Sequence, residues 1–203
     1  HYVSISNSDR SPELTYIATV YNGIQTQHFD FQPIPGDYLL FFGRIHHDKG
    51  TWESIQIAKK ARMKLIISGI IQDQNYFKEK VEPFLNNEDI IFLGPSGPDK
   101  RNKLLGEAQA LLHPINFPEP FGLSVAEAML CGTPVVAFNR GAMPELILHK
   151  KTGFLVHSVE EAVESIKEIP AINRQECRKW SESQFSQETM VKNYIQVYLD
   201  VLK

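Results

Sequence analysis

The chain has 203 residues, and 42% of them are hydrophobic, which is enough to bury one large domain core. Its 21 basic and 24 acidic residues give a formal net charge of -3, so no general electrostatic field attracts nucleic acid or an anionic membrane. Cys131 and Cys177 stand far apart and match no zinc or redox spacing. No apolar run approaches the ~20 residues that cross a bilayer. We therefore expect a soluble, globular, cytoplasmic protein with two packing cysteines.

Residues 1–36 lack a regular rhythm of strands and helices. His1–Ser6 is strand-like, Tyr21–Gly23 carries a turn signal, and Gln32–Gly36 is a proline-containing loop. We expect a connector with one or two strands. Because the strand-like start has no initiator methionine or polar leader, we also expect the segment to continue from an absent domain.

Residues 37–186 alternate short apolar runs with helical patterns. Such unbroken apolar runs are typical of strands that helices cover on both faces. The pattern predicts an α/β fold, a Rossmann-like, doubly wound parallel sheet of about six strands, whose ligands bind beyond the carboxyl ends of the strands. The predicted strands are 38–42, 64–68, 90–93, 110–113, 134–138 and 154–156. The predicted helices are 52–62, 75–85, 100–107, 123–131, 159–167, 174–182 and 188–202.

The last helix, within residues 187–203, carries a broad apolar surface for a terminal element. Two interpretations remain open. The helix docks on its own domain, or it packs across a boundary onto the absent domain.

The first candidate site follows the first strand of the predicted sheet. That strand ends at Gly43, and Arg44 and Lys49 follow in a short loop before Gly50 and the next helix. A guanidinium fork and a mobile ammonium group at the ligand edge suit the oxygens of a diphosphate. The alternative is an ordinary solvated basic loop.

The same loop contains His46, His47 and Asp48, a combination that could bind a metal. Adjacent residues of a strand-like stretch point to opposite sides, so we expect the two imidazoles to diverge. We therefore expect no metal here.

The second candidate site is the pair Glu119 and Glu127, which flanks the start of a predicted helix. Gly122 permits close approach of a ligand, and the unpaired amides of Leu123 and Ser124 attract phosphate or sugar hydroxyls. An ionised carboxylate accepts two hydrogen bonds from a vicinal diol, such as a ribose or a pyranose. The alternative is that Glu127 serves the helix dipole and Glu119 is merely exposed.

A third segment, from Cys131 to Glu145, ends one helix at Gly132 and places the turn Asn139–Gly141 at the ligand edge. Arg140 either approaches the ligand or is solvated, and Glu145 forms a cap or a salt bridge. The chain lacks the glycine-rich phosphate-loop motif, the dinucleotide fingerprint and the hydrolase nucleophile elbow.

These segments, taken in chain order, resemble the group 1 retaining glycosyltransferases of the GT-B fold. The resemblance covers about residues 14–200, and Val20–Gly23 is similar to the family's linker. It implies that the chain is the C-terminal nucleotide-sugar-binding domain and that the amino-terminal acceptor domain is absent. The matching motifs are Gly43-Arg44, Lys49-Gly50, the two glutamates with Pro-Phe-Gly between them, and Gly132-Thr-Pro-Val-Val-Ala.

The resemblance also implies a role for each matching residue. Arg44, Lys49 and Glu119 are the implied catalytic residues: the two cations bind the diphosphate, and Glu119 contacts hydroxyls of the donor sugar. Glu127 holds the ribose hydroxyls, and Ser124 lies near the phosphate. The remaining implied donor-binding residues are Gly43, the backbone at Phe121, Gly122 and Leu123, and, for the base, Leu93 and Gly94.

The implied activity is retaining transfer of a hexosyl group from a nucleoside diphosphate sugar, without a required metal or other cofactor. We favour a UDP-sugar over a GDP-sugar as the donor, and the acceptor is unknown. The isolated chain is expected to bind the donor but to transfer poorly, and the missing domain could attach the protein to the inner membrane surface. The alternatives are a nucleotide-sugar-binding or regulatory module without transfer, or a related GT-B enzyme that acts on sugar nucleotides.

Overall fold

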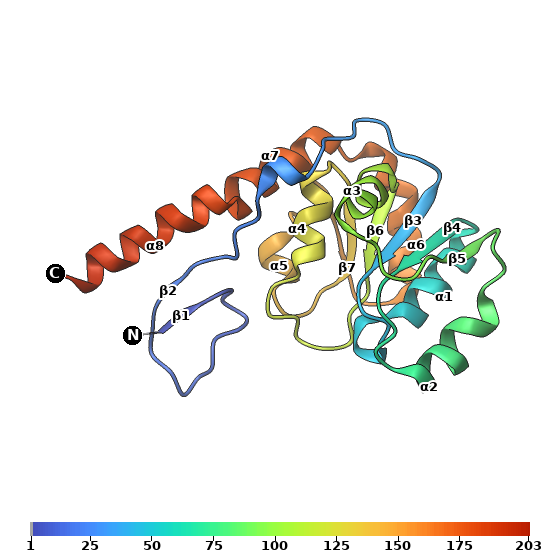
Figure 1. Cartoon of the computed structure of the whole chain (residues 1–203), viewed down its shortest axis with the longest axis horizontal. Coiled ribbons are helices and arrows are strands. Elements are labelled where there is room, and N and C mark those ends of the chain that lie inside the picture. Colours follow the sequence, from blue (N-terminus) through green and yellow to red (C-terminus); the bar gives the residue numbers. More distant parts are fainter. Residues whose placement is uncertain (1) are drawn as a thin grey trace.

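The computed structural model describes residues 2–203, and its centre is a six-stranded sheet in which all strands are parallel (Figure 1). The strands are β3 (Tyr38–Phe42), β4 (Lys64–Ser68), β5 (Ile90–Phe92), β6 (Ala110–His113), β7 (Val135–Phe138) and β8 (Gly153–Val156). They lie in the order β5-β4-β3-β6-β7-β8. The predicted α/β class and the doubly wound parallel sheet are confirmed.

Successive residues of the central strands pack against opposite faces of the sheet. Leu40 and Leu111 belong to the core cluster on one face, whereas Leu39 and Leu112 belong to the cluster on the other. All four side chains are buried. The period of two is that of any strand, and both faces are apolar here because helices cover both.

Helices cover both faces of the sheet (Figure 1). The core residues of α3 (Pro98–Glu107), α4 (Leu123–Leu130) and α7 (Arg174–Phe185) pack with Leu40, and those of α1 (Thr51–Ala61) and α6 (Val159–Glu168) pack with Leu39. These helices begin and end within three residues of the predicted bounds.

The predicted helix over 75–85 is not continuous. The segment forms α2 (Gln74–Tyr76), then the π-helical turn Phe77–Val81, then the 3-10 turn Glu82–Phe84. Pro83 has no amide hydrogen, so the segment cannot end as a regular α-helix. A further short helix, α5 (Met143–Leu146), was not predicted.

The amino-terminal segment forms a separate two-stranded parallel sheet from β1 (Tyr2–Ser4) and β2 (Tyr16–Thr19). The segment thus contains two short strands, and its role as a connector stays a prediction. The first residue of the predicted strand, His1, lies outside the described residues. Figure 1 shows β1 and β2 apart from the main sheet, on the side toward which the last helix projects.

The last helix, α8 (Gln187–Val201), projects away from the sheet beyond α7 (Figure 1). Its base is tied to the connector, because the amide of Gln187 donates to the Ile24 carbonyl at 2.9 Å. Most of its apolar side chains are exposed, including Val191, Ile195, Tyr198 and Leu199. None of the helices within residues 2–203 is both long enough and apolar enough to cross a membrane.

The sheet reverses its direction of winding between β3 and β6. From β3 the chain proceeds outward through β4 to β5, and it then returns to β6 and proceeds through β7 to β8. The loops that follow β3 and β6 therefore diverge, and a crevice forms at the carboxyl ends of these two strands. This is the position at which doubly wound sheets bind ligands.

Candidate functional site

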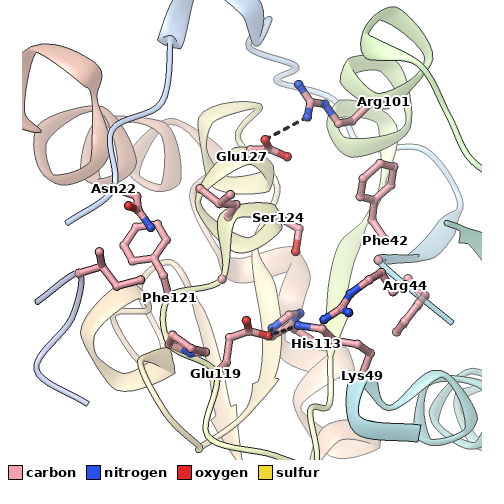
Figure 2. Close-up of a pocket in the computed structure, with 16 residues that line it drawn as sticks. Asn22, Phe42, Arg44, Lys49, Arg101, His113, Glu119, Phe121, Ser124 and Glu127 are labelled. Atoms are coloured by element: carbon pink, nitrogen blue, oxygen red, sulfur yellow. Dashed lines mark hydrogen bonds and ion pairs between the residues drawn. The ribbon is translucent and has the colours of Figure 1, made fainter. Parts of the chain in front are cut away.

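A cavity of about 480 Å³ lies at this switch point (Figure 2), within the size range of small-molecule sites. Its walls come from the loop after β3, from the end of β6 and its following loop, and from the first turns of α4. The cavity brings together nine of the eleven residues expected to bind the donor or act in catalysis. These are Gly43, Arg44, Lys49, Glu119, Phe121, Gly122, Leu123, Ser124 and Glu127.

The amino terminus of α4 opens into the cavity. Gly122 precedes the helix with φ of 101°, a left-handed conformation that favours glycine, and it provides no side-chain cap. Within residues 2–203, no acceptor takes the amide hydrogens of Leu123 and Ser124. Free amides and the positive end of the helix dipole make this wall suitable for an anion.

Glu119 and Lys49 meet on one wall of the cavity. Lys49 Nζ lies 2.5 Å from Glu119 Oε2, and the two side chains are 15% and 12% exposed (Figure 2). Lys49 Nζ also lies 4.6 Å from the centre of the Phe117 ring, in cation-π geometry. The two residues expected to bind sugar and diphosphate therefore bind each other in this structure.

The charge on Glu119 is stabilised by its neighbours. Burial alone would raise the pKa of this carboxyl, but His113 and Lys49 outweigh burial and lower the pKa to about 2. Glu119 is therefore an anion at every physiological pH.

Glu127 lies about one turn along α4, at the other end of the cavity, and pairs with Arg101 of α3. Arg101 Nη1 lies 3.2 Å from Glu127 Oε1, and the Glu127 side chain is 12% exposed (Figure 2). Burial raises the pKa of Glu127, and Arg101 opposes that rise. Unlike Glu119, Glu127 thus has an environment in which burial outweighs the nearby cation.

Arg44 lies on the exposed side of the cavity, where Nη1 donates to Gln72 Oε1 at 2.7 Å. Gln72 follows β4, so the guanidinium bridges the ends of two neighbouring strands. A neutral amide is a weak competitor for a guanidinium compared with a phosphate oxygen. Arg44 is therefore available to an anionic ligand.

Close backbone contacts fix the loops that carry these side chains. A Cβ atom at Gly50, where φ is 74°, would lie 1.9 Å from the carbonyl oxygen of Pro114. The Asn116 amide nitrogen donates to the Asp48 carbonyl at 2.7 Å, which ties the basic loop to the loop before Glu119. A Cβ atom at Gly141 would lie 2.3 Å from the backbone nitrogen of Glu119.

The turn after β7 forms hydrogen bonds to the loop that carries Glu119. The amide of Ala142 donates to the Glu119 carbonyl at 2.9 Å, and Arg140 Nη1 donates to Ile115 O and Asn116 Oδ1 at 3.3 and 3.2 Å. Arg140 thus supports the loop and does not line the cavity. Glu145 accepts the amides of Asn7 and Ser8 at 2.8 and 2.9 Å, so it holds the amino-terminal segment against α5.

The two imidazoles of the basic loop do not diverge as expected. The rings of His46 and His47 lie 4.2 Å apart, because His47 begins a 3-10 turn that ends the extended stretch. His47 Nε2 lies 2.9 Å from Asp48 Oδ1, and His46 Nδ1 accepts the Asp48 amide at 3.3 Å. Ligand atoms of His46, His47 and Asp48 all lie within 4.8 Å of one another, so the predicted divergence is wrong and the expectation of no metal stays untested.

Several residues of the cavity were not predicted, and two predicted residues lie outside it. His113, Arg101 and Asn22 line the cavity together with the predicted residues (Figure 2). Leu93 and Gly94 follow β5 and are not part of its lining; the Gly94 carbonyl accepts the amide of Gly69. Cys131 and Cys177 are buried and free, as expected of packing residues, and burial raises the pKa of each thiol to about 12.

The sheet topology and the position of the cavity are those of a doubly wound α/β domain, a class that binds ligands at its switch point. Residues 25–186 match the family described as "Glycosyl transferases group 1". The chain therefore belongs to the group 1 glycosyltransferases.

Curated relatives of the chain differ in the activities that their names state. The chain is 31% identical over 168 residues to an uncharacterized 41.2 kDa protein of the cps region of Klebsiella pneumoniae, covering 79% of this chain and 45% of the relative. It is 28% identical over 205 residues to the glycogen synthase of Mycobacterium tuberculosis, covering 93% and 49%. It is 33% identical over 141 residues to the GDP-Man:Man(3)GlcNAc(2)-PP-Dol alpha-1,2-mannosyltransferase of Dictyostelium discoideum, covering 61% and 28%. The chain spans less than half the length of these relatives.

Solved structures share the fold at low sequence identity. AviGT4, a glycosyltransferase involved in avilamycin A biosynthesis, superimposes with a TM-score of 0.86 at 23% identity, covering 98% of this chain and 63% of that one. Anabaena Alr3699/HepE, solved in complex with UDP and glucose, superimposes with a TM-score of 0.81 at 23% identity, covering 98% and 62%. These superpositions show that the chain shares its α/β fold with GT-B glycosyltransferases.

Proposed function

We propose that the chain is the donor-binding half of a retaining hexosyltransferase and that its cavity binds a nucleoside diphosphate sugar. The observation that carries the proposal is the spatial order of the groups that line the cavity. Glu119, the free amides of α4 and Glu127 follow one another along one wall, and Lys49 and Arg44 lie opposite. Carboxylates suit the diols of a sugar and a ribose, and amides with two cations suit the diphosphate between them. Membership of the family supports this assignment.

In the proposed reaction, the chain's own residues assist departure of the diphosphate. Negative charge builds on the leaving oxygen as the sugar becomes oxocarbenium-like, and Arg44, Lys49 and the α4 amides stabilise that charge. Lys49 must exchange its bond to Glu119 for a phosphate oxygen, and Arg44 must exchange Gln72. We propose that these groups suffice without a metal ion.

A uridine nucleotide is the favoured donor, and the complex of Alr3699/HepE with UDP and glucose supports it. The Dictyostelium relative, whose name specifies GDP-Man, supports guanosine as the second candidate. We propose that the base lies toward Leu93 and Gly94. Arg101 lines the Glu127 end of the cavity, and α3 begins at Pro98, shortly after that loop.

We propose that residues 1–36 connect the donor-binding domain, 37–186, to an acceptor-binding domain of the parent protein, and that 187–203 pack against that domain. The exposed fractions of Ile195, Tyr198 and Leu202, which are 53%, 63% and 82%, support a covered face. The greater length of the relatives supports the existence of a further domain. Acceptor recognition, and any contact with the inner membrane from the cytoplasm, would belong to it.

A thermal-shift panel tests donor binding directly. The purified chain is heated with UDP-glucose, UDP-N-acetylglucosamine, UDP-galactose or GDP-mannose, and with each free nucleotide. A ligand at a hundredfold excess over its dissociation constant stabilises the folded chain by about 2.7 kcal/mol, so the matching donor should raise Tm by several degrees. A panel in which no nucleotide or nucleotide sugar changes Tm at millimolar concentration would contradict the proposal.

The second candidate is a nucleotide-sugar-binding or regulatory module, or a related sugar-nucleotide enzyme. Both candidates predict a Tm rise, so the discriminating measurement is transfer by the full-length protein with candidate acceptors. Transfer with retention of anomeric configuration supports the first candidate. Donor binding without transfer or hydrolysis supports the second.

A further inference from the structure

His113 occupies the end of β6, at the carboxyl edge of the sheet, and lines the cavity (Figure 2). Its side chain is 8% exposed. Among the described residues, its Nε2 atom is one of the few buried side-chain polar atoms without a hydrogen-bond partner. An unpaired buried polar group costs about 1–3 kcal/mol, so this nitrogen needs an explanation.

The nearest acidic group to this nitrogen is the carboxylate on the sugar side of the cavity. His113 Nε2 lies 3.7 Å from Glu119 Oε2, which is beyond hydrogen-bond length. The same oxygen already accepts Lys49 Nζ at 2.5 Å. An imidazole nitrogen that faces a carboxylate favours the tautomer with its proton on that nitrogen. His113 is thus a donor aimed at an acceptor that another donor occupies.

Binding of the proposed ligand changes the hydrogen-bond donor that Glu119 requires. A diphosphate offers Lys49 several anionic oxygens and competes with one carboxylate for its ammonium group. Once Lys49 turns away, Glu119 is a carboxylate that is 12% exposed, and a buried charge without a partner is costly. In the part of the chain that the structure describes, His113 is the other basic side chain within 4 Å of Glu119.

We propose that His113 is a positioning residue that replaces Lys49 as the hydrogen-bond partner of Glu119 when Lys49 moves to the diphosphate. The Nε2–H of His113 closes the gap to Oε2 and donates to it, so the carboxylate keeps its orientation toward the sugar hydroxyls. This exchange lets one lysine serve the phosphate without loss of the sugar-binding carboxylate. The inference rests on the proposed donor site and adds to it the residue that couples its sugar and phosphate ends.

The test compares a nucleotide with its nucleotide sugar in three variants. UDP and UDP-glucose are titrated calorimetrically into wild type, His113→Leu, His113→Gln and His113→Asn; GDP and GDP-mannose replace them if only guanosine ligands raise Tm. The glutamine amide nitrogen reproduces the position of Nε2, whereas the asparagine amide falls short of it. We expect the preference for the nucleotide sugar over the nucleotide to fall about tenfold in His113→Leu and His113→Asn, with nucleotide binding changed less than about twofold. His113→Gln should restore most of the preference.

A fourth variant separates positioning from packing. In a Glu119→Gln background, His113→Asn should cause no further loss, because the carboxylate it serves is gone. Equal losses for nucleotide and nucleotide sugar, or no rescue by His113→Gln relative to His113→Asn, would overturn the role of His113. The comparison of the two amide variants holds even if His113→Leu folds poorly. A wild-type chain that binds neither ligand pair would instead contradict the proposed function.

Discussion

Lys49 Nζ lies 2.5 Å from Glu119 Oε2, so the cation expected at the diphosphate and the anion expected at the sugar neutralise each other in the same cavity. The pair holds both side chains in place before a ligand arrives. A sugar donor must break this ion pair when it binds, since Lys49 and Glu119 are expected to bind different parts of the donor molecule. The consequences of this pair can be measured in the free chain and in the complex.

The first prediction concerns acid stability of the free chain. The pKa of Glu119 is about 2 in the folded chain, below its usual value of 4.5, so the unfolded chain binds the proton more tightly. Stabilisation by Glu119 is therefore complete above pH 4.5 and is lost as pH falls toward 2, by at most about 3 kcal/mol. Urea unfolding between pH 2.5 and 5.5 should show a steeper loss in wild type than in Glu119→Gln.

The matched control is Glu160→Gln. Glu160 also has a lowered pKa, from its bond to Lys60, but it is fully exposed, and solvent screens its contribution. Its replacement should leave the slope of stability against pH close to wild type. Equal slopes for wild type and Glu119→Gln would contradict the ionised, buried state of Glu119.

The second prediction uses two glycines of the same loop. A Cβ atom at Gly43 would meet only Phe41 Cζ, at 3.9 Å, so the protein's own packing does not require glycine there. Gly43→Ala should leave Tm within a few degrees of wild type but weaken nucleotide binding at least tenfold, because the new methyl group enters the space of the diphosphate. Tm and calorimetric titration with UDP measure the two effects.

Gly50→Ala should show the opposite order of effects. Its φ of 74° and a 1.9 Å approach to the Pro114 carbonyl require glycine for folding, so the loss should appear first in Tm. If Gly43→Ala binds UDP as well as wild type does, the diphosphate does not pass over this strand end.

The third prediction concerns the pH dependence of nucleotide binding. Burial raises the pKa of Glu127 and Arg101 opposes that rise, so loss of Arg101 should raise the pKa further. A protonated carboxyl accepts hydrogen bonds from the ribose hydroxyls less well than a carboxylate does. UDP affinity should therefore rise with pH above 4.5, and in Arg101→Ala this rise should shift to higher pH.

Titrations between pH 5 and 8 measure this shift. Lys103→Ala is the control, since Lys103 lies on the same helix, is 71% exposed and pairs with Glu107 rather than Glu127. The two variants should differ in the midpoint of the pH profile. A shared, unshifted profile would show that Arg101 does not govern the ionisation of Glu127.

The sequence predicted the sheet and most of the cavity because the decisive signals are local. Apolar runs identify the strands, and Gly122 followed by a helical pattern places free amides at the ligand edge. Residues 75–85 show the limit of such signals, since a helical pattern gave way to a π turn and a 3-10 turn around Pro83. Pro83 was the available warning.

The missed site residues depend on contacts that are distant in sequence. Arg101 reaches Glu127 from another helix, and no spacing rule connects them. His113 ends a buried strand, so its sequence context is that of a core residue. Its role in a site is evident only in the structure, where the loop after β6 folds back and places Glu119 beside it. A polar residue at the carboxyl end of a central parallel strand was the one signal that could have identified His113.

The last prediction separates the two glutamates by ligand. If Glu127 holds the ribose, Glu127→Ala should weaken UDP and UDP-glucose equally, by about tenfold or more, because both ligands carry the ribose. If Glu119 contacts the sugar, Glu119→Ala should weaken UDP-glucose by a similar factor but weaken UDP less, since removal of the carboxylate also releases Lys49 to the diphosphate. Parallel titrations of both ligands into both variants decide the assignment, and equal effects of the two substitutions on both ligands would reverse it.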